Sequence, residues 1–274
     1  MHRFTLCAVF LILCTSAGRG DQNHADTRLL SQPAVSASQV AFIYADDLFV
    51  CDLDGRNVRR LTSDQGIESN PVFAPDGKTI AFSAQYEGNT DVYTIPVEGG
   101  APMRLTTHPG PDIVRGFTPD GKAVLFSSPR HVFTNRYAQL FTVPLSGGQP
   151  AQLPIPNGVE ASFSSDGQYV AYTPIADRSG QWKHYRGGTA SRIWIFHFAD
   201  QQVDPIPQPA GRCNDTDPRW QNGTVYFRSD RDGEFNLFAY DAKSKTVQQL
   251  THFTDFPVMS VAAARMIAST TSST

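Results

Sequence analysis

The feature that most constrains this 274-residue chain is an internal repeat of about 44 residues. Its clearest marker is an Asp-Gly pair, which occurs at Asp76, Asp120 and Asp166, so that successive copies lie 44 and 46 residues apart. Weaker copies at 40–62 and 217–251 bring the number to five, and residues 254–258 match the opening of a sixth. Self-similarity at this period predicts an architecture built from stacked, equivalent units.

Each copy predicts four short strands. The Asp-Gly pairs are typical of tight hairpin turns, and Ile80 and Phe82 share one face of the strand that follows the first turn. The pairs Gly99-Gly100 and Gly147-Gly148 predict further hairpins. Because one such sheet cannot bury both faces, we expect an all-β fold, a β-propeller of four-stranded antiparallel blades with five blades plus an incomplete sixth. A two-sheet sandwich, the alternative, does not predict a motif repeated at this period.

The amino terminus has the pattern of a secretory signal. His2 and Arg3 precede an apolar run at 4–14, and small residues follow it. An uncleaved membrane anchor would need roughly 17 or more apolar residues. We therefore expect a signal peptide at 1–20, a flexible segment at 21–32, the propeller at 33–260, an irregular tail at 261–274, and a secreted or periplasmic location. Cys51 and Cys213 remain after signal cleavage and are predicted to be small buried residues.

Composition and motifs exclude several classes of protein. A net charge of -3 and a pI of about 6.1 give no basic surface for nucleic acid. No later apolar run approaches membrane-spanning length, so we expect no stable membrane insertion after signal cleavage. The sequence contains no Gly-x-Ser-x-Gly elbow, no His-Glu-x-x-His and no glycine-rich phosphate loop. These patterns predict no catalytic residues, no metal and no cofactor.

Several motifs indicate a particular group of β-propellers. The unit Phe-x-Pro-Asp-Gly-Lys occurs at 73–78 and 117–122, and Arg-Leu-Thr at 104–106. They resemble the WD-like repeats of TolB and of tricorn-type serine peptidases. The Tyr-Arg-Gly-Gly at 185–188, followed by a Trp-bearing strand at 193–196, resembles the fourth blade of the first propeller in tricorn peptidase homologues. The resemblance covers about 34–260.

This resemblance implies the amino-terminal six-bladed propeller of a larger peptidase, a domain that admits or filters peptides. No segment here matches the later catalytic domains, so the resemblance implies a non-catalytic chain whose partners are peptides or unfolded polypeptide. The sequence after Met259 has neither an Asp-Gly turn nor an aromatic strand. We therefore expect a truncated or frameshifted sixth blade, which leaves the closure of the ring open. The alternatives are a TolB-like module that docks envelope proteins and an intact propeller enzyme acting on glycans.

The candidate binding residues lie in an insertion at 174–192. Basic groups interleaved with aromatic rings can hold a carboxylate or stack on an extended chain. The alternative is a loop anchored by its own aromatic residues over the rim of the propeller. The predicted peptide-binding residues are Arg178, Trp182, Lys183, His184, Tyr185 and Arg186.

Three further patterns have plainer interpretations. The segment 230–236 has acidic spacing like the beginning of a calcium loop, but it lacks the closing Glu and falls where a hairpin is expected. The acidic segment 214–218 enters the fifth copy, where bonding to a turn accounts for it. His131 has no partner at a spacing that indicates a site, and it is predicted to be a surface residue.

Overall fold

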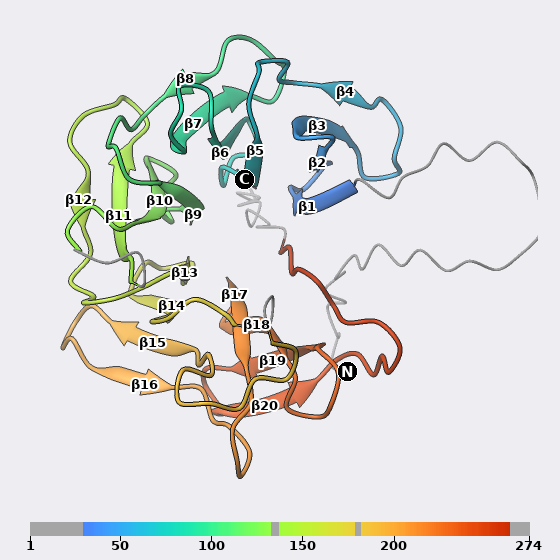
Figure 1. Ribbon diagram of the computed structural model, residues 1–274, viewed down its shortest axis with the longest axis vertical. Coiled ribbons are helices and arrows are strands. Elements are labelled where there is room, and N and C mark those ends of the chain that lie inside the picture. The colour runs from blue at the N-terminus through green and yellow to red at the C-terminus, as the bar shows by residue number, and fades with distance from the viewer. Residues whose placement is uncertain (1–29, 133–136, 179–181, 264–274) are drawn as a thin grey trace, which may run out of the picture.

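The protein forms five antiparallel sheets of four strands each, arranged as blades around a common axis (Figure 1). The computed structural model describes residues 30–132, 137–178 and 182–263. No helix occurs within these ranges, so none of the described residues could cross a bilayer as a helix. The predicted all-β propeller is confirmed. The predicted signal peptide at 1–20, together with 21–29 and 264–274, lies outside the described residues.

Within every blade the strands follow chain order from the axis to the rim. The first blade contains β1 (Leu30–Val35), β2 (Gln39–Tyr44), β3 (Asp47–Asp52) and β4 (Arg59–Arg60). The second contains β5 (Glu68–Phe73), β6 (Thr79–Ala84), β7 (Asp91–Pro96) and β8 (Met103–Arg104). The third contains β9 (Ile113–Phe117), β10 (Ala123–Ser128), β11 (Gln139–Pro144) and β12 (Ala151–Gln152). The fourth contains β13 (Glu160–Phe163), β14 (Tyr169–Thr173), β15 (Trp194–His197) and β16 (Val203–Pro205). The fifth contains β17 (Asp215–Gln221), β18 (Thr224–Ser229), β19 (Asn236–Asp241) and β20 (Thr246–Gln249).

The Asp-Gly pairs make the turns between the first two strands of blades two, three and four. Gly77, Gly121 and Gly167 have φ of 70°, 70° and 73°, the left-handed region that glycine adopts at little cost. The preceding aspartate accepts a hydrogen bond from the backbone two residues on, as Asp120 Oδ1 does from Lys122 N at 3.1 Å. The turn chemistry therefore fixes the register of each hairpin.

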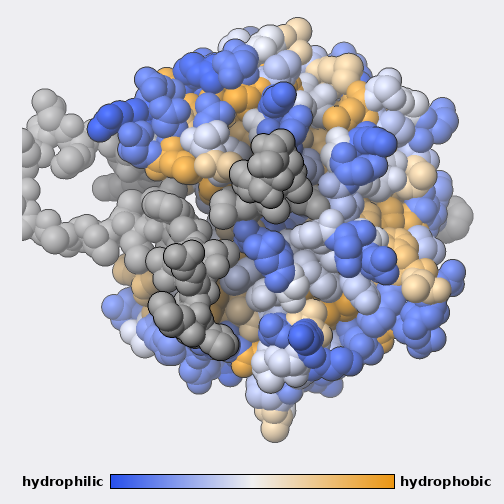
Figure 2. Space-filling model, turned by 180° about the vertical axis from the view of Figure 1, so that it is seen from behind, coloured by the Kyte–Doolittle hydropathy of each residue, from blue (hydrophilic) through white to orange (hydrophobic). Residues whose placement is uncertain are grey.

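The core lies between successive blades. Four clusters of buried apolar side chains each join one sheet to the next, from the pair of blades one and two to the pair of blades four and five. The inner strands also pack in order, β1 against β5, β5 against β9, β9 against β13 and β13 against β17. Hydrophilic residues dominate the rim of the face seen in Figure 2, with smaller hydrophobic areas between them. Face-to-face packing thus buries the apolar faces that no single blade could bury alone.

The two ends of the propeller differ from the predicted boundaries. β1 begins at Leu30, which pairs with Tyr44, so the first sheet includes three residues assigned to the flexible segment. The predicted opening of a sixth blade at 254–258 contains no strand. Instead Val258 N donates to Phe235 O at 2.8 Å, and Val261 N donates to Asp217 Oδ2 at 2.7 Å. These backbone groups therefore form hydrogen bonds with the fifth blade and do not pair with a strand of a sixth blade. In Figure 1 this segment runs between the fifth and first blades.

The two cysteines are buried and free, as predicted. Cys51 lies on β3, and Cys213 directly precedes the fifth blade. Burial raises the pKa of both thiols, that of Cys213 to about 12. Both groups are therefore protonated at neutral pH and act as small apolar side chains.

Glu68 provides a pH-dependent test of the packing between the first two blades. Its side chain is 1% exposed, and its carboxylate has no hydrogen-bond partner of good geometry among the described residues. Burial raises its pKa from 4.5 to about 6. Because the folded protein prefers the protonated form, the cost of ionisation is absent below pH 4.5, grows up to pH 6 and then stays constant.

We expect Glu68→Gln to raise the free energy of unfolding by about 2 kcal/mol at pH 7.5 and to change it little at pH 4, because the glutamine amide remains uncharged. Urea denaturation at the two pH values measures the difference. An equal change in the free energy of unfolding at both pH values would show that the charge of Glu68 does not cause the loss of stability.

Candidate functional site

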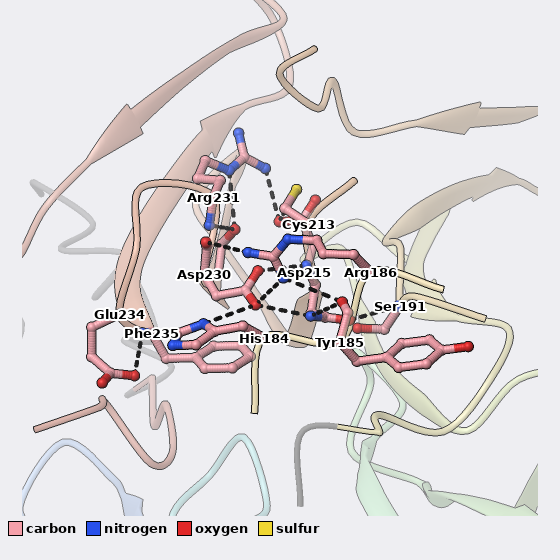
Figure 3. A network of polar contacts seen from close by, with 12 residues as sticks. His184, Tyr185, Arg186, Ser191, Cys213, Asp215, Asp230, Arg231, Glu234 and Phe235 are labelled. Atoms are coloured by element: carbon pink, nitrogen blue, oxygen red, sulfur yellow. Dashed lines mark hydrogen bonds and ion pairs between the residues drawn. The ribbon is translucent and has the colours of Figure 1, made fainter. Parts of the chain in front are cut away.

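The predicted site lies on an insertion between β14 and β15, and a buried carboxylate of the fifth blade anchors it (Figure 3). Asp230 follows β18 directly and is completely buried. Arg186 Nη1 lies 2.5 Å from Asp230 Oδ2, and His184 Nδ1 lies 3.5 Å from the same oxygen. Asn214 donates to both carboxylate oxygens, through its backbone nitrogen at 2.7 Å and its Nδ2 at 2.9 Å. Asp230 therefore collects donors from two segments distant in the chain.

Further contacts hold the insertion in the same place. Lys183 Nζ lies 2.5 Å from Glu234 Oε2, and its hydrogen bond lowers the pKa of that carboxyl group. Arg186 Nη2 donates to the Asp230 carbonyl at 3.2 Å. Asn214 Nδ2 also donates to Tyr185 O at 2.9 Å. The network satisfies polar groups at the edge of the fifth blade and at the same time fixes the backbone of 183–186.

The structure thus divides the six predicted residues into two groups. Lys183, His184 and Arg186 face carboxylates of the fifth blade, so charged contacts hold this part of the insertion, whereas the anchored-loop alternative assigned the anchoring to aromatic residues. The remaining three residues are Arg178, Trp182 and Tyr185. The Arg178 guanidinium forms no ion pair with a carboxylate of the described residues.

The second group forms a small cluster of its own. Trp182 is 59% exposed, and its ring centroid lies 6.1 Å from that of Tyr185. The Arg178 carbonyl accepts a hydrogen bond from Trp182 N at 2.9 Å. A hydrogen bond from Thr189, together with the nearby positive charges of Arg178 and Arg212, lowers the pKa of Tyr185. The insertion therefore presents aromatic surface in a positively charged environment.

The two glycines that follow Tyr185 and Arg186 have different roles. A Cβ added at Gly187 would lie 2.0 Å from the Tyr185 hydroxyl, so the tyrosine ring folds over this position only because it is glycine. A Cβ added at Gly188 would meet no atom within 4 Å. Gly188, like Gly187, lines an open cavity.

This cavity, of about 510 Å³, lies between the insertion and the third and fourth blades. Its polar lining includes Arg192, a basic residue of the predicted insertion, together with Ser191 and Arg212, which we did not predict as site residues. Ser191 is 2% exposed, and its Oγ has no hydrogen-bond partner among the described residues. The aromatic and proline residues of the lining are Tyr137, Pro156, Tyr172, Pro174 and Trp194.

A second cavity, of about 320 Å³, lies at the axis of the propeller. Its lining comes from all five inner strands and includes Arg115, Gly116 and Arg219. Arg115 and the nearby Glu160 carry opposite charges. Burial opposes ionisation of Glu160, but the charge of Arg115 and hydrogen bonds from Asp217 N and Thr216 Oγ1 hold its pKa below the usual value. The axis is therefore lined by charges that largely compensate one another.

The plainer interpretations can be placed as well. Residues 230–235 form the turn between β18 and β19, as predicted, and Asn236 begins β19. Asp230 itself is the anchor described above. In the described part of the chain no three His, Cys, Asp or Glu side chains are grouped so as to hold a metal ion. His131 is partnered, with Nδ1 3.0 Å from Gln152 Oε1 and its ring against Phe141.

The segment 214–218 does not form the predicted turn, because β17 begins within it, at Asp215. Its carboxylates are buried in ion pairs. Asp215 pairs with Arg231, and Asp217 pairs with Arg219. Side-chain bonding does account for these residues, but their partners are arginine side chains, Arg219 of β17 and Arg231 of the turn after β18.

Comparison with known proteins places this geometry in a family. The family model described as "Tricorn protease N-terminal beta propeller domain" matches residues 27–267. Tricorn protease homolog 1 of Streptomyces coelicolor is 30% identical over 213 residues, which are 77% of this chain and 20% of that protein. A crystal structure of the tricorn protease superposes with a TM-score of 0.72 at 26% identity, covering 84% of this chain and 23% of that one.

The fold is shared more widely. The structure of putative TolB from Agrobacterium tumefaciens superposes with a TM-score of 0.65 at 20% identity, over 81% of this chain and 80% of that one. The chain spans about a fifth of the length of the curated tricorn relatives it matches.

Proposed function

The chain belongs to the tricorn protease N-terminal β-propeller family, and from this premise we propose that it is a non-catalytic propeller that binds or admits peptides. It matches about a fifth of its relatives' length, in the propeller alone. The proposal extends to a secreted or periplasmic location, where peptides or unfolded polypeptide would be its partners.

The observation that carries the proposal is the cavity of about 510 Å³ beside the anchored insertion. Its volume lies within the range of roughly 300–1,000 Å³ that is usual for ligand pockets, and it combines apolar walls with a few polar groups. A loop held on a rigid scaffold is a common position for recognition residues. The network around Asp230 supplies that rigidity here.

The state of the two cysteines supports a non-catalytic role. A nucleophilic cysteine requires a lowered pKa and access to solvent. Cys51 and Cys213 are buried, and their thiol pKa values are raised. Neither thiol is therefore suited to nucleophilic attack on a peptide.

Two glycines allow a matched test of where peptides bind. Gly188 lines the cavity beside the insertion, Gly116 lines the axial cavity, and an added Cβ meets no atom within 4 Å at either position. We expect Gly188→Leu to weaken binding of a mixture of blocked decapeptides at least tenfold, because the leucine occupies the cavity, and Gly116→Leu to leave it unchanged. Calorimetric titration measures both.

Mass spectrometry of the same peptides after incubation provides the second readout. We expect every peptide to be recovered intact. Cleavage of any peptide by the purified chain would contradict the non-catalytic role, and absence of binding to the unaltered protein would contradict the peptide-binding role.

A further inference from the structure

An arginine covers a pair of aromatic rings at two junctions between blades. In the third blade, Phe126 of β10 pairs with Phe141 of β11, and the Arg130 guanidinium lies 5.0 Å and 4.9 Å from the two ring centroids. Arg130 Nη2 lies 2.6 Å from Asp112 Oδ2, and its Nε donates to Ser128 Oγ at 3.0 Å. Cation, aromatic pair and buried carboxylate together close the junction with the second blade.

The fifth blade repeats this arrangement. Phe227 pairs with Phe238, and the Arg231 guanidinium lies 5.1 Å from each centroid. Arg231 Nη2 lies 2.9 Å from Asp215 Oδ1, and its Nε donates to Ser229 Oγ at 3.1 Å. The same three parts therefore occupy the same positions two blades further along the chain.

The second blade uses a tyrosine in the arginine's place. Tyr86 occupies the position that corresponds to Arg130, counted from the Asp-Gly turn, and its ring centroid lies 4.9 Å from that of Tyr93. Glu68, the buried carboxylate described above, corresponds to Asp112. The junction between the first two blades is closed as well.

The fourth blade has no covering side chain at this position. Tyr172 of β14 pairs with Trp194 of β15, as Phe126 pairs with Phe141. The residue that corresponds to Arg130 is Ala176, because the insertion begins here. Val159 stands where Asp112 stands in the third blade. Both rings line the 510 Å³ cavity, where Tyr172 is 2% exposed and Trp194 is half-buried.

The rim of this cavity is positively charged. Arg192 and Arg212 line it and are exposed, and no carboxylate of the described residues lies within 4 Å of either guanidinium. The other arginines of the comparison, Arg130 and Arg231, each have a buried aspartate. Ser191 Oγ adds a buried hydroxyl that has no partner in the described part of the chain and that a ligand could satisfy. Arg212 Nη1 donates to the Arg186 carbonyl at 3.3 Å, and neither arginine has an ion-pair partner among the described residues. The cavity thus offers an aromatic wall, two arginines without a carboxylate and one buried hydroxyl.

We propose that this cavity binds a peptide segment in which an aromatic side chain stands next to a carboxylate. The aromatic side chain packs on Trp194 and Tyr172, and the carboxylate binds Arg192 and Arg212. This inference rests on the proposed peptide-binding function and specifies the chemistry of its ligand. The carboxylate comes from an acidic side chain or from a free C-terminus.

The test compares decapeptides by calorimetry at low salt. Three are blocked at both ends and carry a central Phe-Glu, Phe-Gln or Ala-Glu pair, and a fourth ends in phenylalanine with a free carboxylate. We expect the Phe-Glu peptide to bind about tenfold more tightly than Phe-Gln and than Ala-Glu, because each comparison removes one of the two contacts. If the fourth peptide binds as tightly as Phe-Glu, the terminal carboxylate is an equivalent source of the charge.

Variants connect the preference to the two arginines. In a protein carrying Arg192→Gln and Arg212→Gln, we expect Phe-Glu and Phe-Gln to bind equally, whereas Arg56→Gln, an exposed arginine of the first blade, retains the preference. Both altered arginines are exposed, and unchanged thermal unfolding verifies the fold. Equal binding of all peptides to the unaltered protein would overturn this inference while leaving the proposed function standing. Binding of none would overturn both.

Discussion

Replacing Arg130 by alanine is expected to lower the free energy of unfolding by about 3–5 kcal/mol, because it leaves a buried carboxylate without its partner. Asp112 is completely buried, and the Arg130 side chain beside it is only 10% exposed. The substitution also removes the guanidinium that covers Phe126 and Phe141. Urea denaturation at pH 7 measures the loss.

The repeat provides an internal replicate and the surface provides a control. Arg231→Ala removes the same contacts in the fifth blade and should cost a similar amount. Arg56→Ala removes an exposed ion pair with Asp54 and should change stability by less than about 1 kcal/mol. Losses as small as that control for both buried arginines would show that these pairs do not hold the blades together.

Replacing Asp230 by alanine is expected to release the insertion as well as to destabilise the fifth blade. The substitution removes the acceptor for Arg186 and for both donors of Asn214, and the stability loss should be about 3 kcal/mol. Lys183 and Arg186 then become accessible to trypsin, because the Arg186 side chain and the backbone of 183–186 lose their buried anchor and only the exposed contact of Lys183 with Glu234 remains. We expect cleavage after these two residues to accelerate more than tenfold at temperatures where the unaltered protein is folded.

A neighbouring anchor serves as the control for Asp230. Glu234→Gln weakens only the contact with Lys183, whose side chain is 59% exposed, and should accelerate cleavage far less. Mass spectrometry of the early tryptic products identifies the sites. Cleavage elsewhere first, or equal rates in the two variants, would show that Asp230 does not anchor the insertion.

The repeat predicted the blades because its signals are local. An Asp-Gly pair and its flanking alternation fix a hairpin within a dozen residues, and Gly77, Gly121 and Gly167 adopt the positive φ that this requires. The carboxyl-terminal segment was harder to predict, because its conformation depends on the fifth blade. Val258 and Val261 bind backbone and side-chain groups of residues 217–235, a pairing that no short pattern in 254–261 encodes.

The candidate site shows a similar division. The insertion and its basic and aromatic residues could be recognised in the sequence, but their individual roles could not. Asp230 lies 44 residues from Arg186, within a segment that has the composition of an ordinary turn. The cavity is present because Ala176 and Val159 replace the arginine and the aspartate of the third blade. This replacement is recognised only when structurally equivalent positions of the blades are compared.

Hydrogen exchange with and without the Phe-Glu peptide tests the central claim most directly, because it reports where on the propeller a peptide binds. The account predicts slower exchange at 186–194 and at 156–159, the segments that line the cavity beside the insertion. Protection confined to the inner strands at 113–117 and 160–163 would place the peptide at the axis and contradict the account, as would exchange that the peptide leaves unchanged.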